Sequence, residues 1–286
     1  MTGMTPGPAP VPRAEAARAG PDASSSEYWD EVARRLPRMR PMPPLLARRK
    51  RAAHLALIDR WVAPVHGLRI LKTDLFEEAF AQGSFLPDLA GAGAEVWAID
   101  VSAEIAGASV AAFPGDRPLR AVCGDVRRLP FADASFDVVV SNSTLDHFDS
   151  TTDIESSLSE LARVLRPGGV AIVTVDNPRN LGHPLLRFAA RTGMVPYRLG
   201  ATFDRRGLAE AVGRTGLRVD DTTTLLHNPR LVAAALAAAA GAVRCRWPAD
   251  AVDRLLDRWE RVESPRWRER LGSFVAVRGV KDSGAR

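Results

Sequence analysis

The sequence has little of what disulfide-rich, zinc-binding or membrane-spanning proteins need. It has two cysteines in 286 residues, Cys123 and Cys245, which stand too far apart in the sequence to form a disulfide scaffold or a zinc site of their own. The longest apolar run, residues 231–243, is mostly alanine and falls short of the ~20 residues of a membrane span. The first residues lack the apolar core of a secretory signal. We therefore expect a soluble, cytoplasmic protein that binds neither a membrane nor a metal.

Aromatic residues are also scarce, at 6%, and this weakens the case for nucleic-acid binding that the net charge of +5 would otherwise make. The basic residues concentrate between positions 34 and 51, with almost no aromatic side chains among them. Elsewhere arginines stand beside acids, as in Asp253-Arg254. We interpret the basic cluster as a solvated helix face and expect no nucleic-acid partner.

With 46% hydrophobic residues, the chain is long enough to bury one large core or two small ones. Residues 1–25 are rich in Pro, Ala, Gly and Ser, a composition that predicts a disordered tail. Ser26 has the character of a helix N-cap before a helix over residues 27–36. A second helix is predicted over residues 45–62, so we assign residues 26–66 to an N-terminal helical lid.

From residue 67 onward, short apolar runs alternate with helical patterns. This alternation predicts a largely parallel sheet with helices on both faces. Strands are expected at 68–71, 95–99, 119–122, 136–140, 170–175, 217–225 and 273–280. Helices are expected at 77–89, 103–113, 153–165 and 205–215, with a helical insertion at about 229–262. The fold class is therefore α/β, a doubly wound seven-stranded sheet over residues 67–286 whose last strand is antiparallel.

Four segments within residues 67–180 resemble the class I S-adenosylmethionine-dependent methyltransferases, in particular the small-molecule group of methyltransferase type 11. They are residues 94–102, which end a strand in Asp100, residues 123–131, residues 135–148, and the helix-to-strand turn at 161–169. The resemblance implies a Rossmann-like fold, S-adenosyl-L-methionine as cofactor, and in-line methyl transfer to a small organic acceptor. The sequence leaves the oligomeric state open.

The resemblance also implies cofactor contacts at the ends of strands. A carboxylate at the carboxyl end of a strand, like Asp100, can accept hydrogen bonds from both ribose hydroxyls, and Val101 follows it. The alternative is that Asp100 forms part of a helix cap, since Ser102 and Glu104 come next.

Two further segments carry implied cofactor residues. Asp125, between Gly124 and Val126, can accept the adenine amine while Val126 packs on the ring; the alternative is a turn carboxylate. Asn142 and Ser143 follow the fourth predicted strand, at the tip where the family binds its ligands.

His147 lies just past the same strand. The ordinary pKa of a histidine, near 6.5, suits a general base at neutral pH, so His147 is the candidate catalytic residue. The alternative is that it packs or bonds to the backbone.

The first loop departs from the family pattern. Lys72 stands where the family has an acid, and Asp74, Phe76 and Glu78 stand where it has glycines. Because a residue with a Cβ pays about 1 kcal/mol or more for a left-handed backbone, we expect a loop of another shape. Lys72 and Asp74 are retained as candidate cofactor residues, with Asp74 or Glu78 supplying a carboxylate for the methionine ammonium. Alternatively, Lys72 and Asp74 simply pair with each other.

Two other functions therefore stay open: a nucleotide-ligand binder that does not methylate, and a pseudo-enzyme scaffold that keeps the fold. The acceptor is not identified by the sequence. Apolar residues at 185–188 and 194–197 are candidates to line its cavity, with Arg187, Arg191 and Arg198 at the mouth. Those arginines are equally consistent with solvated charges.

Overall fold

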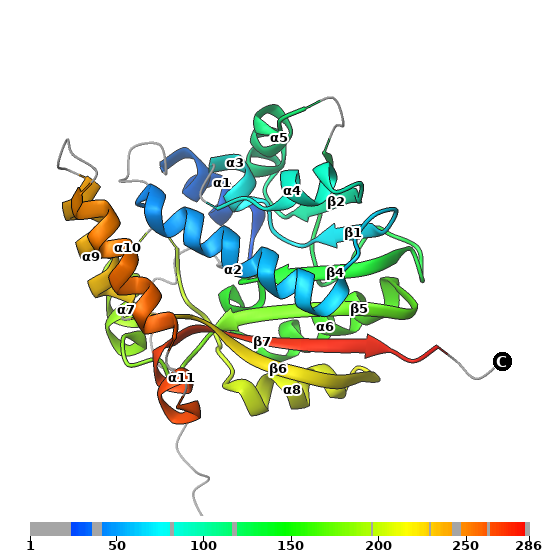
Figure 1. Cartoon of the computed structure of the whole chain (residues 1–286). Helices are drawn as coiled ribbons and strands as arrows, with labels where there is room; N and C mark the ends of the chain where they lie inside the picture. Colours follow the sequence, from blue (N-terminus) through cyan, green and yellow to red (C-terminus); the bar gives the residue numbers. More distant parts are fainter. Residues whose placement is uncertain are drawn as a thin grey trace, which may run out of the picture.

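The computed structural model describes residues 24–35, 42–80, 83–115, 119–195, 197–228, 230–241, 247–261 and 264–283. Within these residues, seven strands form one sheet of order β3-β2-β1-β4-β5-β7-β6 (Figure 1). The strands are β1 (Arg69–Lys72), β2 (Glu95–Asp100), β3 (Arg120–Cys123), β4 (Phe136–Asn142), β5 (Leu165–Asp176), β6 (Leu217–His227) and β7 (Gly272–Lys281). Only β7 runs against its neighbours, β5 and β6. The predicted mixed α/β sheet with an antiparallel last strand is confirmed.

Helices cover both faces of the sheet. They are α1 (Ser26–Arg35), α2 (Pro44–Val62), α3 (Phe76–Phe80), α4 (Leu86–Gly91), α5 (Ala103–Ala112), η2 (Leu145–His147), α6 (Thr151–Val164), α7 (His183–Arg191), α8 (Arg205–Gly213), α9 (Arg230–Gly241), α10 (Trp247–Glu260) and α11 (Pro265–Leu271). In Figure 1, α2 crosses one face, and α6 and α8 lie under the other. Along the chain, the helices α9, α10 and α11 follow β6 and precede β7. The sequence predicts a helical insertion at this position. The division into tail, lid and methyltransferase-like domain stays a prediction.

The core consists of two apolar layers, one on each face of the sheet. Alternate residues of β4 show the division: Val138 and Val140 face the layer that includes Ile58 and Trp61 of α2. Val139 faces the other layer, with Leu158 of α6. The continuous apolar run in β4 is therefore explained by burial on both faces, as in other parallel sheets.

Two predictions of local structure are wrong. The single helix expected over residues 77–89 is two short helices, α3 and α4. Gly83, between them, has φ +105°, and an added Cβ would lie 2.9 Å from the carbonyl oxygen of Ala47. The chain therefore turns there under contact with α2. The cap of α1 is also one residue earlier than expected, because Ser25 Oγ accepts the N–H of Tyr28 at 3.2 Å.

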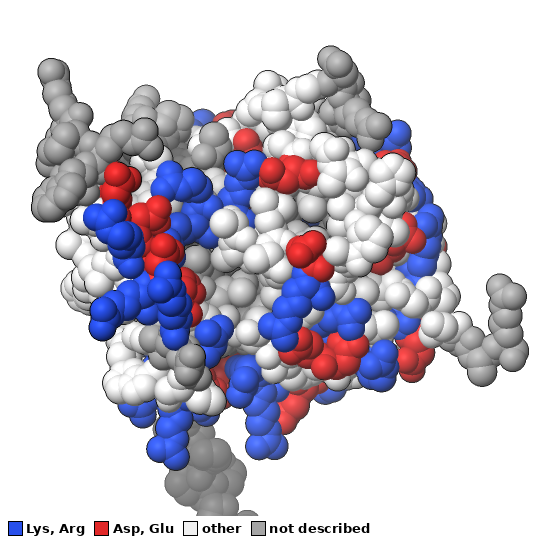
Figure 2. All heavy atoms as spheres, viewed as in Figure 1, with Lys and Arg blue, Asp and Glu red and all other residues white. Residues whose placement is uncertain are grey.

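The basic residues of α2 are matched by acids. Arg49 pairs with Asp253 at 2.6 Å and Asp257 at 2.7 Å, both on α10, and Arg51 pairs with Asp88 of α4 at 2.5 Å. Figure 2 shows acidic and basic atoms interleaved over this face. This part of the basic cluster joins helices to one another. Arg38 and Arg40 lie outside the described residues.

No helix in the described ranges combines the length and the apolar character that crossing a bilayer requires.

Candidate functional site

A cavity of about 620 Å³ opens at the carboxyl ends of the parallel strands. Part of its lining comes from residues at or just past the ends of β1, β2, β3, β4 and β5: Thr73, Asp74, Asp100, Val101, Gly124, Asp125, Asn142, Ser143 and Asp176. The strand order reverses between β1 and β4, and ligands of open α/β sheets bind at such reversals. The volume lies in the range of small-molecule sites.

Asp100 ends β2 and is held by backbone N–H groups. Its two carboxylate oxygens accept from Leu75 at 3.0 Å and from Ser102 at 2.8 Å. Burial raises the pKa of Asp100 to about 7, and the nearby Asp74 adds to this. Since a carboxylate has about four lone-pair positions, both oxygens keep capacity for a ligand's hydroxyl groups. The N-cap of α5 is Ser102, whose side chain accepts the Ile105 N–H, and Asp100 in turn accepts the N–H of Ser102.

Asp125 lies past β3 and is held by a neighbouring arginine. Arg127 forms a two-pronged contact with it, at 2.9 Å from Nε and 2.6 Å from Nη2. Arg127 also reaches Asp153 at 3.2 Å. Gly124 and Val126 line the cavity beside Asp125. An adenine amine would therefore meet a carboxylate that already shares its charge with an arginine.

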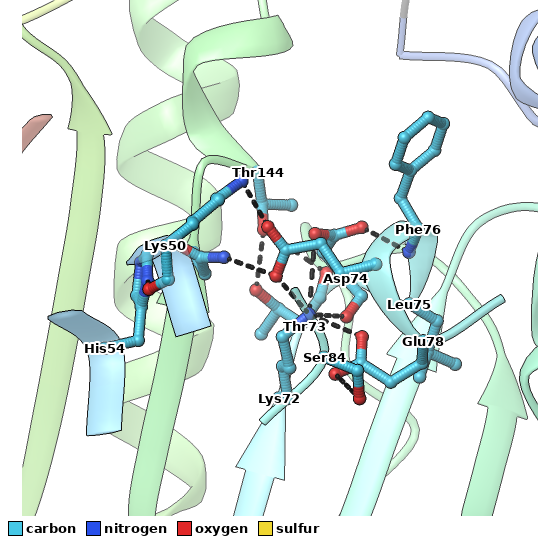
Figure 3. A network of polar contacts seen from close by, with 12 residues as sticks. Lys50, His54, Lys72, Thr73, Asp74, Leu75, Phe76, Glu78, Ser84 and Thr144 are labelled. Atoms are coloured by element: carbon cyan, nitrogen blue, oxygen red, sulfur yellow. Dashed lines mark hydrogen bonds and ion pairs between the residues drawn. The ribbon is translucent and has the colours of Figure 1, made fainter. Parts of the chain in front are cut away.

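The loop after β1 is built around a buried ammonium group (Figure 3). Lys72 is fully buried, and its Nζ lies 2.9 Å from Glu78 Oε2 and 3.5 Å from Asp74 Oδ2. Burial would lower the pKa of Lys72, but Asp74, Glu78 and Glu77 outweigh it and raise the pKa. Burial raises the pKa of Glu78 to about 6 in spite of Lys72. Lys72 and Glu78 therefore fix the shape of the loop from beneath.

Glu77 extends this network to α2. Lys50 of α2 forms an ion pair with Glu77, and Asn142 Nδ2 donates to Glu77 at 3.0 Å. Although burial acts against it, the charges of Lys50 and Lys72 lower the pKa of Glu77. Lys50, Asp74 and Glu77 line the cavity, whereas Lys72 and Glu78 do not. A helix far upstream in the sequence thus supplies a cation to this side of the cavity.

His147 also lines the cavity and lies among aromatic side chains. Its Nδ1 lies 2.8 Å from the carbonyl oxygen of Arg198, and its ring meets Trp29 at 4.8 Å and Tyr197 at 5.5 Å between centroids. A carbonyl only accepts, so in the neutral ring Nδ1 carries the proton. The Nε2 atom is then the basic nitrogen.

Two buried carboxylates lie beside His147. Asp146 Oδ2 accepts the backbone N–H of Asp176 at 2.7 Å, and both residues line the cavity. Burial and the charge of Asp176 raise the pKa of Asp146 to about 6.

The structure brings nine of the ten sequence-predicted site residues to one cavity: Asp74, Asp100, Val101, Gly124, Asp125, Val126, Asn142, Ser143 and His147. The exception is Lys72, which points into the protein because β1 is buried and Glu78 holds the ammonium group. Glu78 is not at the cavity surface either, for the same reason. Of the apolar candidates for the acceptor cavity, Leu186, Met194, Val195 and Tyr197 line it, while Leu185 and Phe188 point to solvent.

Sequence reasoning missed Lys50, Glu77, Asp146 and Asp176 in the cavity lining. Asp176 ends β5 as Asp100 ends β2, so the strand-end rule that found Asp100 would also have found it. Lys50 carries no local signal, because its place depends on how α2 packs.

Comparison with known proteins places this geometry in a family. The family described as "Methyltransferase domain" matches residues 77–173. A demethylmenaquinone methyltransferase of Roseiflexus sp. (strain RS-1) is 45% identical over 80 residues, which are 27% of this chain and 31% of that protein. A malonyl-[acyl-carrier protein] O-methyltransferase of Methylovorus sp. (strain MP688) is 32% identical over 96 residues, 34% of this chain and 31% of that protein.

The fold likeness extends further along the chain than the sequence match. A structure from Thermotoga maritima, described as a SAM-dependent methyltransferase and possible histamine N-methyltransferase, covers 90% of this chain and 99% of its own, with a TM-score of 0.57 and 17% identity. The sequence matches span about a third of the two curated relatives.

Residues 77–173 thus match a methyltransferase domain, and the fold is similar to that of a SAM-dependent methyltransferase. The cofactor that this family implies is S-adenosylmethionine.

Proposed function

We propose that the protein transfers a methyl group from S-adenosylmethionine to a small organic acceptor. The observation that carries the proposal is the cavity at the strand reversal, which Asp100, Asp125 and His147 all line. The two curated relatives have different acceptors in their names, a demethylmenaquinone and a malonyl-acyl carrier protein. We therefore propose no single acceptor.

The adenosine part of the cofactor fits the β2–β3 side. Asp100 is buried yet still lines the cavity, and its backbone partners fix it in place without using all its lone pairs. Asp125 and Val126 would meet the adenine edge and face. We base the assignment of Asp100 to the ribose and Asp125 to the adenine on these positions in the cavity lining.

The methionine part fits the β1 side through charge. Asp74, whose side chain is 19% exposed, would accept the ammonium group. Lys50, whose side chain is 14% exposed beside Glu77, would face the carboxylate group. In this proposal Lys72 orders the loop and does not touch the cofactor.

When bound, S-adenosylmethionine supplies an electrophilic methyl group on a sulfonium. The chain's own residues align the acceptor and exclude water. Trp29 and Tyr197 pack edge-on against His147, which holds its ring in place. Nε2 of His147 would accept the proton that a hydroxyl or amine acceptor loses.

Isothermal titration with S-adenosylmethionine and S-adenosylhomocysteine tests the proposal. We expect both to bind, and Asp100→Asn to weaken both by about ten- to a hundredfold, as for loss of a charged hydrogen bond. The matched control is Asp133→Asn, because Asp133 is 78% exposed and does not line the cavity. No binding of either ligand at millimolar concentration would contradict the proposal.

One observation supports a second function, a nucleotide-ligand binder without methyl transfer. The carboxylates of Glu77 and Glu78 on the β1 side are already engaged by lysines, unlike a glycine-rich loop that offers free backbone N–H groups. Equal affinities for adenosine and S-adenosylhomocysteine would favour this second function, because the methionine part would then find no site.

A further inference from the structure

The segment that follows β5 is unusual in charge. Residues 177–203 contain four arginines and no aspartate or glutamate. Two of these arginines have acidic partners elsewhere: Arg179 pairs with Asp204 at 3.1 Å, and Arg198 lies 3.8 Å from Asp149. For Arg187 and Arg191 on α7, no acidic side chain among the described residues lies within ion-pair distance.

Large apolar side chains are exposed on the same segment. Leu181 is 60% exposed, Leu185 56%, Phe188 58% and Met194 70%. These four residues are half of the eight large hydrophobic side chains that are exposed in the described ranges. We call them the α7 apolar surface. Exposed apolar residues scattered singly need no explanation, but a cluster marks an interaction site.

The helix arranges the two kinds of residue in neighbouring stripes. Leu186, Ala189 and Ala190 are buried against the protein. Leu185 and Phe188 are three positions apart, and Arg187 and Arg191 are four apart, so each pair shares one side of the helix. Both pairs fall on the side that faces away from the core. An outward face that is apolar along one stripe and basic along the next matches a helix lying in a membrane interface.

The α7 apolar surface adjoins the cavity. Met194 is both exposed and part of the cavity lining, and Leu186, on the inner side of α7, lines the cavity as well. The backbone N–H of Leu181 bonds to the carbonyl of Arg270 at 2.9 Å, which joins this segment to α11. Figure 1 shows α7 and α11 at the same corner of the molecule. On α11, Trp267 is 51% exposed among further arginines.

We propose that the α7 apolar surface docks the protein on an anionic phospholipid bilayer, with Leu185 and Phe188 in the acyl boundary and Arg187 and Arg191 at the lipid phosphates. The contact is interfacial and needs no spanning helix. It differs from the expectation from the sequence that the protein binds no membrane. It does not depend on the proposed methyl transfer, although it would place the cavity mouth at the lipid surface.

Charge decides between a bilayer and a second copy of this chain. An isologous contact would bring together two copies of this segment, each with four arginines and no acidic residue. A leaflet of anionic lipid offers the opposite charge, and each arginine near it contributes about fivefold in partitioning.

Co-sedimentation with vesicles tests the proposal. We expect the full chain to bind vesicles of phosphatidylcholine mixed with phosphatidylglycerol, and to bind phosphatidylcholine alone much less. Binding should fall as salt is raised. The double variant Leu185→Glu/Phe188→Glu should lose about tenfold or more in partitioning. The double variant Arg187→Gln/Arg191→Gln should lose about fivefold per arginine, on the anionic vesicles only.

Matched controls are available on other helices. Val110→Glu changes an apolar residue of α5 that is 45% exposed, and Arg206→Gln changes an arginine of α8 whose side chain is 88% exposed. Neither should affect vesicle binding, and all variants should keep the parent's affinity for S-adenosylhomocysteine. The proposal is overturned if the parent does not bind anionic vesicles, or if the Val110 variant loses as much as the α7 variant. It is also overturned if the α7 variant changes only the oligomeric state measured by light scattering.

Discussion

The two sides of the cavity hold their carboxylates by different means. On the β2 side, Asp100 is fixed by two backbone N–H groups. On the β1 side, Glu77 and Glu78 are fixed by the ammonium groups of Lys50 and Lys72. Backbone donors leave Asp100 with spare lone pairs, whereas a buried ion pair uses the charge of the carboxylate that forms it. The β2 side is thus suited to receive a ligand, and the β1 side mainly keeps its own loop in place.

In the loop after β1, different residues serve two roles that one glycine-rich loop serves in the family pattern. In the family pattern, the first loop both turns the chain and approaches the cofactor. Here Lys72 and Glu78 hold the turn from within, and Asp74 and Lys50 are left at the cavity surface. Changes to the inner pair should affect stability, and changes to the outer pair should affect binding.

The largest expected effect follows removal of the buried cation. Lys72→Met leaves Glu78 without its ion-pair partner in a fully buried site, and such a loss costs about 3–5 kcal/mol in the free energy of unfolding. Urea denaturation followed by circular dichroism measures it. As a control, Arg206→Ala breaks an exposed ion pair and should change the free energy of unfolding far less than Lys72→Met does. If Lys72→Met proves no worse than this control, the buried network does not support the loop.

A matched pair of carboxylates gives the next effect. Asp74→Asn should weaken S-adenosylhomocysteine by about tenfold and leave adenosine unchanged, because only the amino-acid end loses a partner. Glu78→Gln should lower stability without changing the ratio of the two affinities, since Glu78 does not reach the cavity. Isothermal titration of both ligands against both variants measures the ratios. A larger change of the ratio in the Glu78 variant would show that inner and outer residues have been assigned the wrong way round.

The site residues predictable from the sequence are those fixed by strand ends. Asp100 and Asp125 follow apolar runs that are recognisable as strands, and parallel strands bring their carboxyl ends to one edge of a sheet. Lys72 also ends a strand, but the direction of its side chain depends on the buried residues that pack around it. Burying a lysine requires a partner, and that partner, Glu78, enters only through the local path of α3.

Other features depend on contacts between distant parts of the chain. The break between α3 and α4 comes from Gly83 meeting Ala47 of α2, and Lys50 reaches the cavity from the same helix. The hydrophobic pattern of a short stretch of sequence cannot predict either contact, because each one joins residues from distant parts of the chain. The largely parallel sheet was predictable because the alternation of strands and helices along the chain is enough to indicate it.

The pH dependence of stability and binding tests the β2 side directly. Burial raises the pKa of Asp100 to about 7, above its value of about 3.9 in an unfolded chain. The folded protein therefore keeps a proton that the unfolded chain loses. The resulting stabilisation is full below about pH 4 and is lost as the pH rises through about 7. Asp100→Asn cannot titrate, so its stability relative to the parent should rise across this interval.

Adenosine binding should respond in the opposite sense to the parent's stability. Hydrogen bonds to a charged acceptor exceed those to a neutral one by about 1 kcal/mol, so the affinity of the parent for adenosine should rise about fivefold as Asp100 ionises. Asp125→Asn should keep this pH dependence and Asp100→Asn should abolish it, as titrations at several pH values can show. A parent whose adenosine affinity stays flat from about pH 5 to about pH 8 would mean that the ligand does not meet the Asp100 carboxylate. The ribose would then have to be held elsewhere in the cavity, and the contrast between its two sides would lose its functional meaning.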